Sequence, residues 1–152
     1  MIIRPAQPAD VEAIFDVRTA VTENILDRSQ LAEMGITPAT ITKMIRQSAC
    51  AWVAIEDDRV VGFSMADLEG GSLFAAFVLP SREGQGIGKT LVAVAENALF
   101  ERHAVIWLET GKTTRAAGFY RHLGWANPVE ITEWDIRLEK SKPAAEAPSA
   151  RP

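Results

Sequence analysis

The chain has 152 residues, of which 47% are hydrophobic and 24% charged, and its formal net charge is −4. This length and composition predict one globular domain that buries about 70% of its unfolded surface, and the acidic balance argues against a nucleic-acid partner. A single cysteine, Cys50, excludes an internal disulfide and a multi-cysteine metal site, so no metal is expected. No apolar run is long enough to span a membrane, and the first residues do not resemble a signal peptide, so we expect a cytoplasmic protein.

The first predicted elements are a short strand at residues 2–4, which Pro5 ends, and a helix that opens at Pro8-Ala9-Asp10. One apolar stripe follows the predicted helix: Ile14, Val17, Val21 and Ile25. The polar residues 27–35 predict a loop.

Thr37-Pro38 fits an N-cap followed by proline at the first helical position, so a second helix is expected through about Gln47. Two helices would then form a wall beside the sheet. We expect this wall to determine substrate specificity.

Three strand-like runs follow, at residues 51–56, 60–68 and 72–79. Asp57-Asp58-Arg59 and Glu69-Gly70-Gly71 supply the turns between them, which predicts an antiparallel meander. The last of these strands leads directly into a glycine-rich stretch, Pro80 to Leu91.

A helix is expected from Ile87 to Phe100, because apolar residues recur there at helical spacing. The apolar run 104–108 predicts a strand buried on both faces. A strand, a crossover helix and a second strand of this kind form a right-handed parallel unit.

The last predicted helix spans Lys112 to Leu123 and is stopped by Gly124. A hairpin-like pair follows, at residues 125–128 and 129–138. We expect a single domain at residues 1–139 and a disordered tail at 140–152, which lacks periodicity and apolar side chains to bury.

The glycine-rich stretch predicts a phosphate site, because glycines let the backbone approach a ligand and the following helix presents unpaired N–H groups. Gly88-Lys89-Thr90 matches the end of a Walker A loop, but the opening position holds Glu83, and Gly84 comes one residue late. The dinucleotide fingerprint fails as well, because Gly84, Gly86 and Gly88 are spaced two and two.

The segment Glu83-x-x-Gly86-x-Gly88 resembles the pyrophosphate loop of the GCN5-related N-acetyltransferases, usually written Gln/Arg-x-x-Gly-x-Gly/Ala. A second motif, Thr113-x-x-Ala116-x-x-Phe119-Tyr120 followed by Leu123-Gly124-Trp125, resembles the family's Asn-x-x-Ala-x-x-Phe-Tyr segment. The two motifs occur in the family's order, and the resemblance covers residues 1–139. It implies an α/β (α+β) fold with a mixed, mostly antiparallel sheet of six or seven strands and about four helices.

The resemblance also implies a binding site for acetyl-CoA as co-substrate. The backbone of Phe77, Val78 and Leu79 would pair with the pantetheine arm. The pyrophosphate would accept hydrogen bonds from the amides of Glu83, Gly84, Gln85, Gly86, Ile87, Gly88 and Lys89. Thr113 and Ala116 would contact the cofactor, although Thr113 replaces the family's asparagine. Four cations would offset the phosphate charge or remain solvated at the surface: Arg82, Lys89, Lys112 and Arg115.

Tyr120 is the candidate catalytic residue, because in this family the tyrosine at the matching motif position is often assigned as the general acid that protonates the departing CoA thiolate. The alternative is a core tyrosine beside Phe119. The general base stays open between an ordered water and five carboxylates: Glu23, Asp67, Glu69, Glu109 and Glu133.

The leading hypothesis is an N-acetyltransferase that acts on a primary amine of a small molecule or peptide. The alternative is an acyl-CoA-binding regulatory module without turnover, suggested by Glu83, Thr113 and the unidentified base. A nucleotide-binding protein is a third hypothesis and rests on Gly88-Lys89-Thr90. The strands at the C-terminal edge suggest a homodimer, because an unpaired edge invites pairing.

Overall fold

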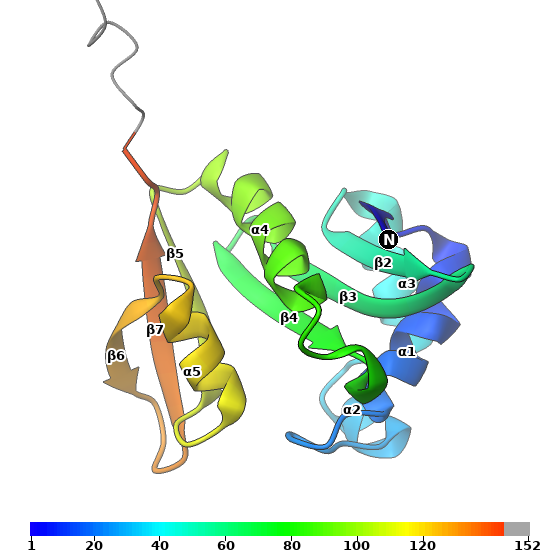
Figure 1. Cartoon of the computed structure of the whole chain (residues 1–152), viewed down its shortest axis with the longest axis horizontal. Coiled ribbons are helices and arrows are strands. Elements are labelled where there is room, and N and C mark those ends of the chain that lie inside the picture. The colour runs from blue at the N-terminus through cyan, green and yellow to red at the C-terminus, as the bar shows by residue number, and fades with distance from the viewer. Residues whose placement is uncertain (145–152) are drawn as a thin grey trace, which may run out of the picture.

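In the computed structural model, which describes residues 1–144, seven strands form one open sheet in the order β1-β2-β3-β4-β5-β7-β6 (Figure 1). The strands are β1 (Ile2–Pro5), β2 (Ala51–Glu56), β3 (Arg59–Asp67), β4 (Ser72–Val78), β5 (Val105–Gly111), β6 (Ala126–Glu130) and β7 (Asp135–Ser141). The helices are η1 (Pro8–Asp10), α1 (Val11–Thr19), α2 (Arg28–Glu33), α3 (Pro38–Gln47), η2 (Pro80–Arg82), α4 (Ile87–Phe100) and α5 (Arg115–His122). The predicted fold class is confirmed, with five α-helices where about four were expected.

The sheet divides into two halves between β4 and β5. All other neighbouring strands pair antiparallel, whereas β4 and β5 are parallel, as predicted. Their register holds one pair only, Ser72 with Trp107. Beyond this pair the two strands diverge, so β1–β4 form one half of the sheet and β5–β7 the other (Figure 1).

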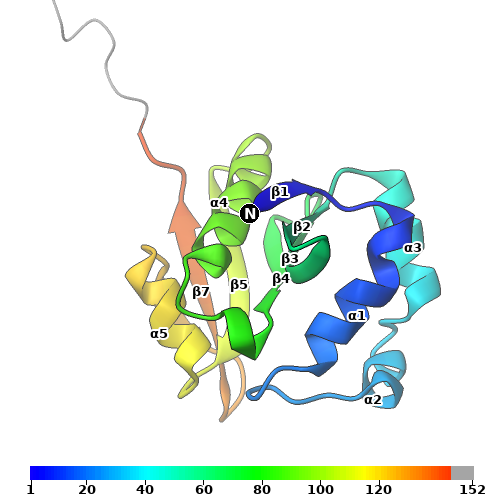
Figure 2. The same ribbon diagram turned by 45° about the vertical axis from the view of Figure 1, so that its right-hand side comes forward.

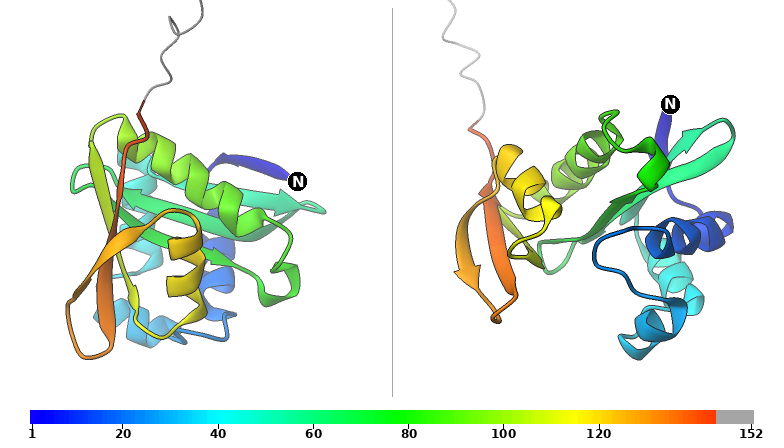
Figure 3. Two further views of the ribbon diagram at one scale, coloured as in Figure 1. Left: turned by 60° about the vertical axis from the view of Figure 1, so that its left-hand side comes forward. Right: turned by 60° about the horizontal axis from the view of Figure 1, so that its bottom comes forward.

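Helices cover both faces of this divided sheet. α4 crosses one face, and α1 and α3 cover the opposite one (Figures 2 and 3). Leu91, Val92 and Ala95 of α4 are fully buried in a core that includes Val61 of β3 and Leu138 of β7. Burial of one Leu or Val side chain contributes about 1.5–3 kcal/mol to stability. Since the side chains of α4 pack against strands from both halves, this burial holds the two halves together.

Hydrogen bonds attach α4 to both halves as well. Ser64 of β3 donates its hydroxyl to the Leu91 carbonyl at 2.9 Å. On the other side, buried Glu96 accepts from Trp125 Nε1 at 3.0 Å and from Lys140 Nζ of β7 at 2.8 Å. The Lys140 ammonium also donates to the Leu123 carbonyl, at 2.9 Å, so this partly buried ion pair has a further hydrogen bond at each end.

The region between β1 and β2 differs from the prediction. α1 ends at Thr19, so Val21 and Ile25 lie outside it, and Ile25 is 69% exposed. The predicted loop at 27–35 contains a helix, α2. Its start is a reciprocal cap: the Asp27 side chain accepts from the Gln30 amide at 2.8 Å, and the Gln30 side chain accepts from the Asp27 amide at 2.9 Å.

Three predictions for the C-terminal half were also wrong, one on burial and two on boundaries. β5 is not buried on both faces, because Val105 is 47% exposed while Ile106 is fully buried. The last helix begins at Arg115 instead of Lys112, because the Thr114 side chain caps it. The predicted tail begins too early, since β7 continues through Lys140 and Ser141, which pair with Ile106 and Val105.

The remainder of that tail, from residue 145, lies outside the described residues. Within residues 1–144, no helix is both long and apolar enough to cross a membrane.

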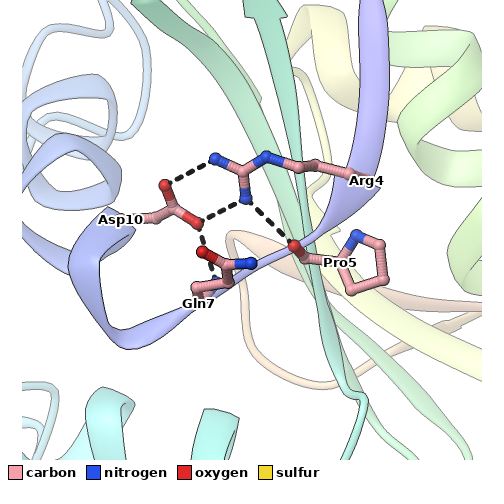
Figure 4. A network of polar contacts seen from close by, with 4 residues as sticks. All are labelled: Arg4, Pro5, Gln7 and Asp10. Atoms are coloured by element: carbon pink, nitrogen blue, oxygen red, sulfur yellow. Dashed lines mark hydrogen bonds and ion pairs between the residues drawn. The ribbon is translucent and has the colours of Figure 1, made fainter.

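A buried carboxylate ties β1 to the start of α1 (Figure 4). Asp10, 8% exposed, accepts from both terminal nitrogens of Arg4, at 2.7 and 2.9 Å, and from the Gln7 amide at 2.7 Å. The guanidinium also donates to the Pro5 carbonyl, at 3.1 Å. The Arg4 hydrogen bonds lower the pKa of Asp10 below its ordinary value.

Asp10→Asn is therefore expected to destabilise the protein at pH 7 by about 1–3 kcal/mol, because charge-assisted hydrogen bonds are lost. A carboxylate whose pKa is lowered by folding stabilises the protein above its unfolded pKa of about 3.9 and loses that effect as the pH falls. Urea unfolding at pH 7, 5 and 3 should show the gap between wild type and variant narrowing below pH 4. Asp27→Asn is the matched control, because asparagine also caps helices well. A gap that is independent of pH would contradict this account.

Candidate functional site

The loop between β4 and α4 adopts a backbone conformation that its glycines permit. A single 3-10 turn, η2, leads out of β4, and Gly84 and Gly86 then have φ angles of 77° and 81°. Left-handed backbone is strained for any residue with a Cβ atom, so both positions need glycine. Gly88 differs, because it lies in the first turn of α4 without a positive φ.

Six consecutive amides of this loop, those of residues 84–89, donate to no acceptor within residues 1–144. Three of them belong to the first turn of α4, where no preceding carbonyl is in place to accept. The Glu83 amide differs, because it lies 3.4 Å from the Pro80 carbonyl. Free amides at the positive end of a 14-residue helix form a site that attracts an anion.

Three of the four cations predicted near this loop have carboxylate partners. Arg82 pairs with Glu56 at 2.6 Å. Arg115 pairs with Glu83 at 3.1 Å, and Lys112 pairs with Glu130. Of these four, only Lys89, exposed on the first turn of α4, forms no ion pair with a carboxylate of residues 1–144, so it is the one of the four left for an anion in the loop.

The end of β4 presents its backbone to the gap between the halves of the sheet. The Leu79 amide donates to the Val61 carbonyl at 2.8 Å, and the Leu79 carbonyl accepts from the Arg82 amide at 2.9 Å. Leu79, predicted to pair with the pantetheine arm, therefore has no free backbone group. Because the directions of backbone N–H and C=O groups alternate along a strand, the backbone groups of Phe77 also point toward β3. Val78 alone of the three predicted residues faces the gap.

The second motif surrounds the start of α5, across the gap from the loop. Thr113 lies exposed in the turn before the helix, and Ala116 is half-buried in its first turn. The Arg115 amide donates to Glu23, at 3.1 Å, so this candidate base is bound at a helix end.

Tyr120, the predicted general acid, lies on α5 with its ring in the core. It is 8% exposed, and its ring meets Trp125 edge-on with centroids 6.1 Å apart. Burial raises the pKa of the Tyr120 phenol, so the group is protonated at neutral pH. The residue thus combines a packing role with a neutral hydroxyl that is able to donate a proton or a hydrogen bond.

A pocket of about 180 Å³ lies on the opposite face of the sheet, between α1, α2, α3 and strands β3 and β4. Its walls are apolar except for Arg18 and Asn24. The Arg18 guanidinium lies 4.4 Å from the centroid of the Phe77 ring and donates to the Asn24 carbonyl at 3.1 Å. None of the five candidate base carboxylates lines this pocket.

Sequence reasoning did not identify Arg18, although a signal was present. Val11, Ile14 and Phe15 form the buried face of α1, and Arg18 continues it at helical spacing. A charged residue on a buried stripe needs a partner or a ligand. Within residues 1–144, no group of three or more His, Cys, Asp or Glu side chains gathers as a metal site.

A model of the acetyltransferase (GNAT) family matches residues 13–125, which include both motifs and, apart from the first two residues of α1, the helices around the pocket. The chain belongs to this family. A curated relative, the peptidyl-lysine N-acetyltransferase YjaB of Salmonella typhimurium, is 40% identical over 75 residues. That match covers 49% of this chain and 48% of YjaB, so it spans about half the length of this relative.

Solved acetyltransferase structures share the GNAT fold over nearly the whole chain. The PaiA N-acetyltransferase of Thermoplasma acidophilum, in complex with coenzyme A, has a TM-score of 0.77 at 18% identity and covers 93% of this chain and 98% of its own. YncA of Salmonella typhimurium, with acetyl-CoA, has a TM-score of 0.69 at 18% identity and covers 99% of both chains. At this identity the likeness shows the fold alone.

Two glycine substitutions test the loop. In Gly86→Ala the left-handed backbone becomes strained, so we expect a loss of about 1–2 kcal/mol in unfolding free energy and at least about tenfold weaker acetyl-CoA binding by calorimetry. Gly88→Ala is the matched control. Its Cβ would lie 3.5 Å from Phe119 Cζ, an ordinary contact, so stability and affinity should change little. Equal effects of both variants would contradict the assignment of the loop.

Proposed function

We propose that the protein is an acetyl-CoA-dependent N-acetyltransferase that moves the acetyl group to a primary amine of a small molecule or peptide. The observation that carries this proposal is the row of free amides at residues 84–89, beside the gap between β4 and β5. Membership of the GNAT family supports it, as do the coenzyme A and acetyl-CoA in the PaiA and YncA structures. The name of YjaB supports an amine acceptor.

The donor would lie across the gap between the halves of the sheet. Its pyrophosphate accepts from the amides of residues 84–89, and Lys89 offsets part of the charge. The backbone of Val78 pairs with the pantetheine arm. Thr113 and Ala116 contact the donor from the α5 side.

Transfer occurs by direct attack within a ternary complex. The neutral amine forms a bond to the thioester carbonyl carbon, and the resulting intermediate breaks its C–S bond to expel the CoA thiolate. The nitrogen loses one proton and the sulfur gains one, so the products are an amide and CoA thiol. We assign the proton delivered to sulfur to the Tyr120 phenol, which burial keeps protonated, and the proton from nitrogen restores the phenol.

Removal of the ammonium proton is assigned to water, because the five candidate carboxylates do not line the pocket. Glu23 is held by the Arg115 amide, and Asp67 accepts from the Gly70 amide at 3.0 Å in its own turn. Glu69, Glu109 and Glu133 are exposed at the surface.

The alternative is an acyl-CoA-binding regulatory module without turnover. The apolar pocket without a carboxylate and the tightly packed ring of Tyr120 favour it. The nucleotide hypothesis, based on Gly88-Lys89-Thr90, loses its basis with membership of the GNAT family.

Release of CoA thiol over a panel of primary amines separates these functions, with Tyr120→Phe as the decisive variant. Removal of the hydroxyl should lower kcat about 100-fold or more. The phenylalanine ring preserves the contact with Trp125, so the melting temperature and the affinity for acetyl-CoA should stay at their wild-type values. Unchanged turnover would leave Tyr120 with a packing role only. A wild-type protein that binds acetyl-CoA but releases no thiol with any amine would favour the regulatory module.

Two further expectations belong to this proposal. A homodimer would form through β6, the edge strand of the sheet, whose five residues are all exposed. A cytoplasmic location and a single acetyltransferase domain stay predictions, and β7 extends that domain from the predicted end at residue 139 to at least Ser141.

A further inference from the structure

Arg18 is a buried cation without a carboxylate partner. It is 9% exposed, and no carboxylate oxygen of residues 1–144 lies within 4 Å of its guanidinium nitrogens. Two other arginines of the N-terminal region are paired: Arg4 with Asp10, and Arg28 with Glu12 and Asp16.

The hydrogen-bonding capacity of Arg18 is largely unused. A guanidinium carries five N–H donors in a planar fork that matches a carboxylate. One terminal nitrogen donates to the Asn24 carbonyl, and the Phe77 ring covers one face of the group. Burial lowers the pKa of Arg18, yet a guanidinium stays charged at neutral pH. A charge that is largely buried without a carboxylate partner opposes folding, and the nitrogens of Arg18 that make no hydrogen bond keep some accessible surface, so the position of Arg18 in a pocket wall points to an anionic ligand.

The rest of the pocket suits one compact apolar group. Its walls include Phe15, Leu31, Ile41, Phe63 and Met65. A volume of about 180 Å³ exceeds the ~150 Å³ of an apolar cavity that holds benzene. There is room for one phenyl or branched aliphatic side chain.

The pocket also adjoins the strand that is proposed to hold the acetyl donor. Phe77 lines the pocket and lies beneath Arg18, and the next residue, Val78, presents its backbone to the gap between β4 and β5. A ligand on Arg18 would therefore lie close to β4, the strand that is proposed to hold the donor.

We propose that the acetyl acceptor is a small amine that carries both a carboxylate and one compact apolar side chain, in the size range of a single hydrophobic amino acid. Arg18 binds the carboxylate and the pocket binds the side chain. This inference rests on the proposed acetyltransferase function and names its substrate class. A peptide lysine, whose side chain ends in a cation and brings no carboxylate, does not match the pocket.

Three probes test the pocket without turnover, each titrated by calorimetry into the wild-type protein with saturating coenzyme A. N-acetyl-L-leucine, the product of the expected reaction, should bind. N-acetyl-L-leucinamide lacks the carboxylate and N-acetylglycine lacks the side chain, and each should bind at least about tenfold more weakly. Equal affinity of the first two probes would overturn the proposal, because the carboxylate would then contribute nothing.

Arg18→Met, which keeps the length and removes the charge, should weaken N-acetyl-L-leucine binding at least about tenfold. Its melting temperature should equal or exceed that of wild type, because an unpaired buried charge is removed. The matched control is Arg28→Met, since Arg28 also covers an aromatic ring, 5.0 Å from the Phe15 centroid, but lies outside the pocket. This control should bind like wild type.

A lower melting temperature with unchanged ligand affinity in Arg18→Met would show that Arg18 only supports the Asn24 loop, and would overturn the proposal. If that variant does not fold, Arg18→Lys keeps the charge and loses the fork, and it should bind with reduced affinity.

Turnover separates this inference from the proposed function. L-leucine should give a higher kcat/KM for thiol release than L-leucinamide or an N-terminally blocked lysine peptide. Efficient acetylation of the lysine peptide with no preference for leucine would overturn the substrate class and leave the acetyltransferase intact. Absence of acetyl-CoA binding would overturn the acetyltransferase, while the affinities of the N-acetyl probes would still decide what the pocket binds.

Discussion

The structure depends on the way α4 holds together a sheet that divides between β4 and β5. These strands share one residue pair, so the ladder hydrogen bonds that normally join neighbours are missing along most of their length. The buried face of α4 and the Glu96 contacts to Trp125 and Lys140 connect the two halves instead. Because α4 joins the two halves in place of strand pairing, β4 and β5 can diverge while the sheet remains a single folded unit.

The proposed site follows from this opening. The loop that begins α4 must turn sharply out of β4, and the positive φ angles of Gly84 and Gly86 make that turn possible. The same turn leaves the amides of residues 84–89 without partners among residues 1–144, next to the strand end where Val78 faces the gap. On the other face, Phe77 connects β4 to the apolar pocket and to Arg18. β4 thus contributes to both proposed sites. Its backbone lies at the site of the acetyl donor, and a side chain of the same strand lies at the site of the acceptor.

Much of this arrangement could be predicted from sequence, because it depends on local chemistry. Thr37-Pro38 located the start of α3, and the glycines located the loop before α4. Other features depend on contacts that no local pattern encodes. α2 has six residues, too few for periodicity, and only its Asp27–Gln30 cap marked it. The hydrogen bonds that occupy the backbone of Leu79 depend on the register of its strand. The exposure of Val105 depends on which face of the sheet is left uncovered. Arg18 lies on the buried face of α1 but was not part of the predicted apolar stripe, and a helical period indicates burial but not which ligand is bound.

The central claim is that the free amides of residues 84–89 bind the pyrophosphate of the acetyl donor, with Val78 beside its pantetheine arm. Amide NMR spectra of the ¹⁵N-labelled protein, recorded during titration with coenzyme A, test it most directly. The account predicts that the largest chemical-shift changes fall on residues 84–89 and 78, together with slowed exchange of those amides with water. Saturable binding of coenzyme A that leaves these amides unchanged would contradict it.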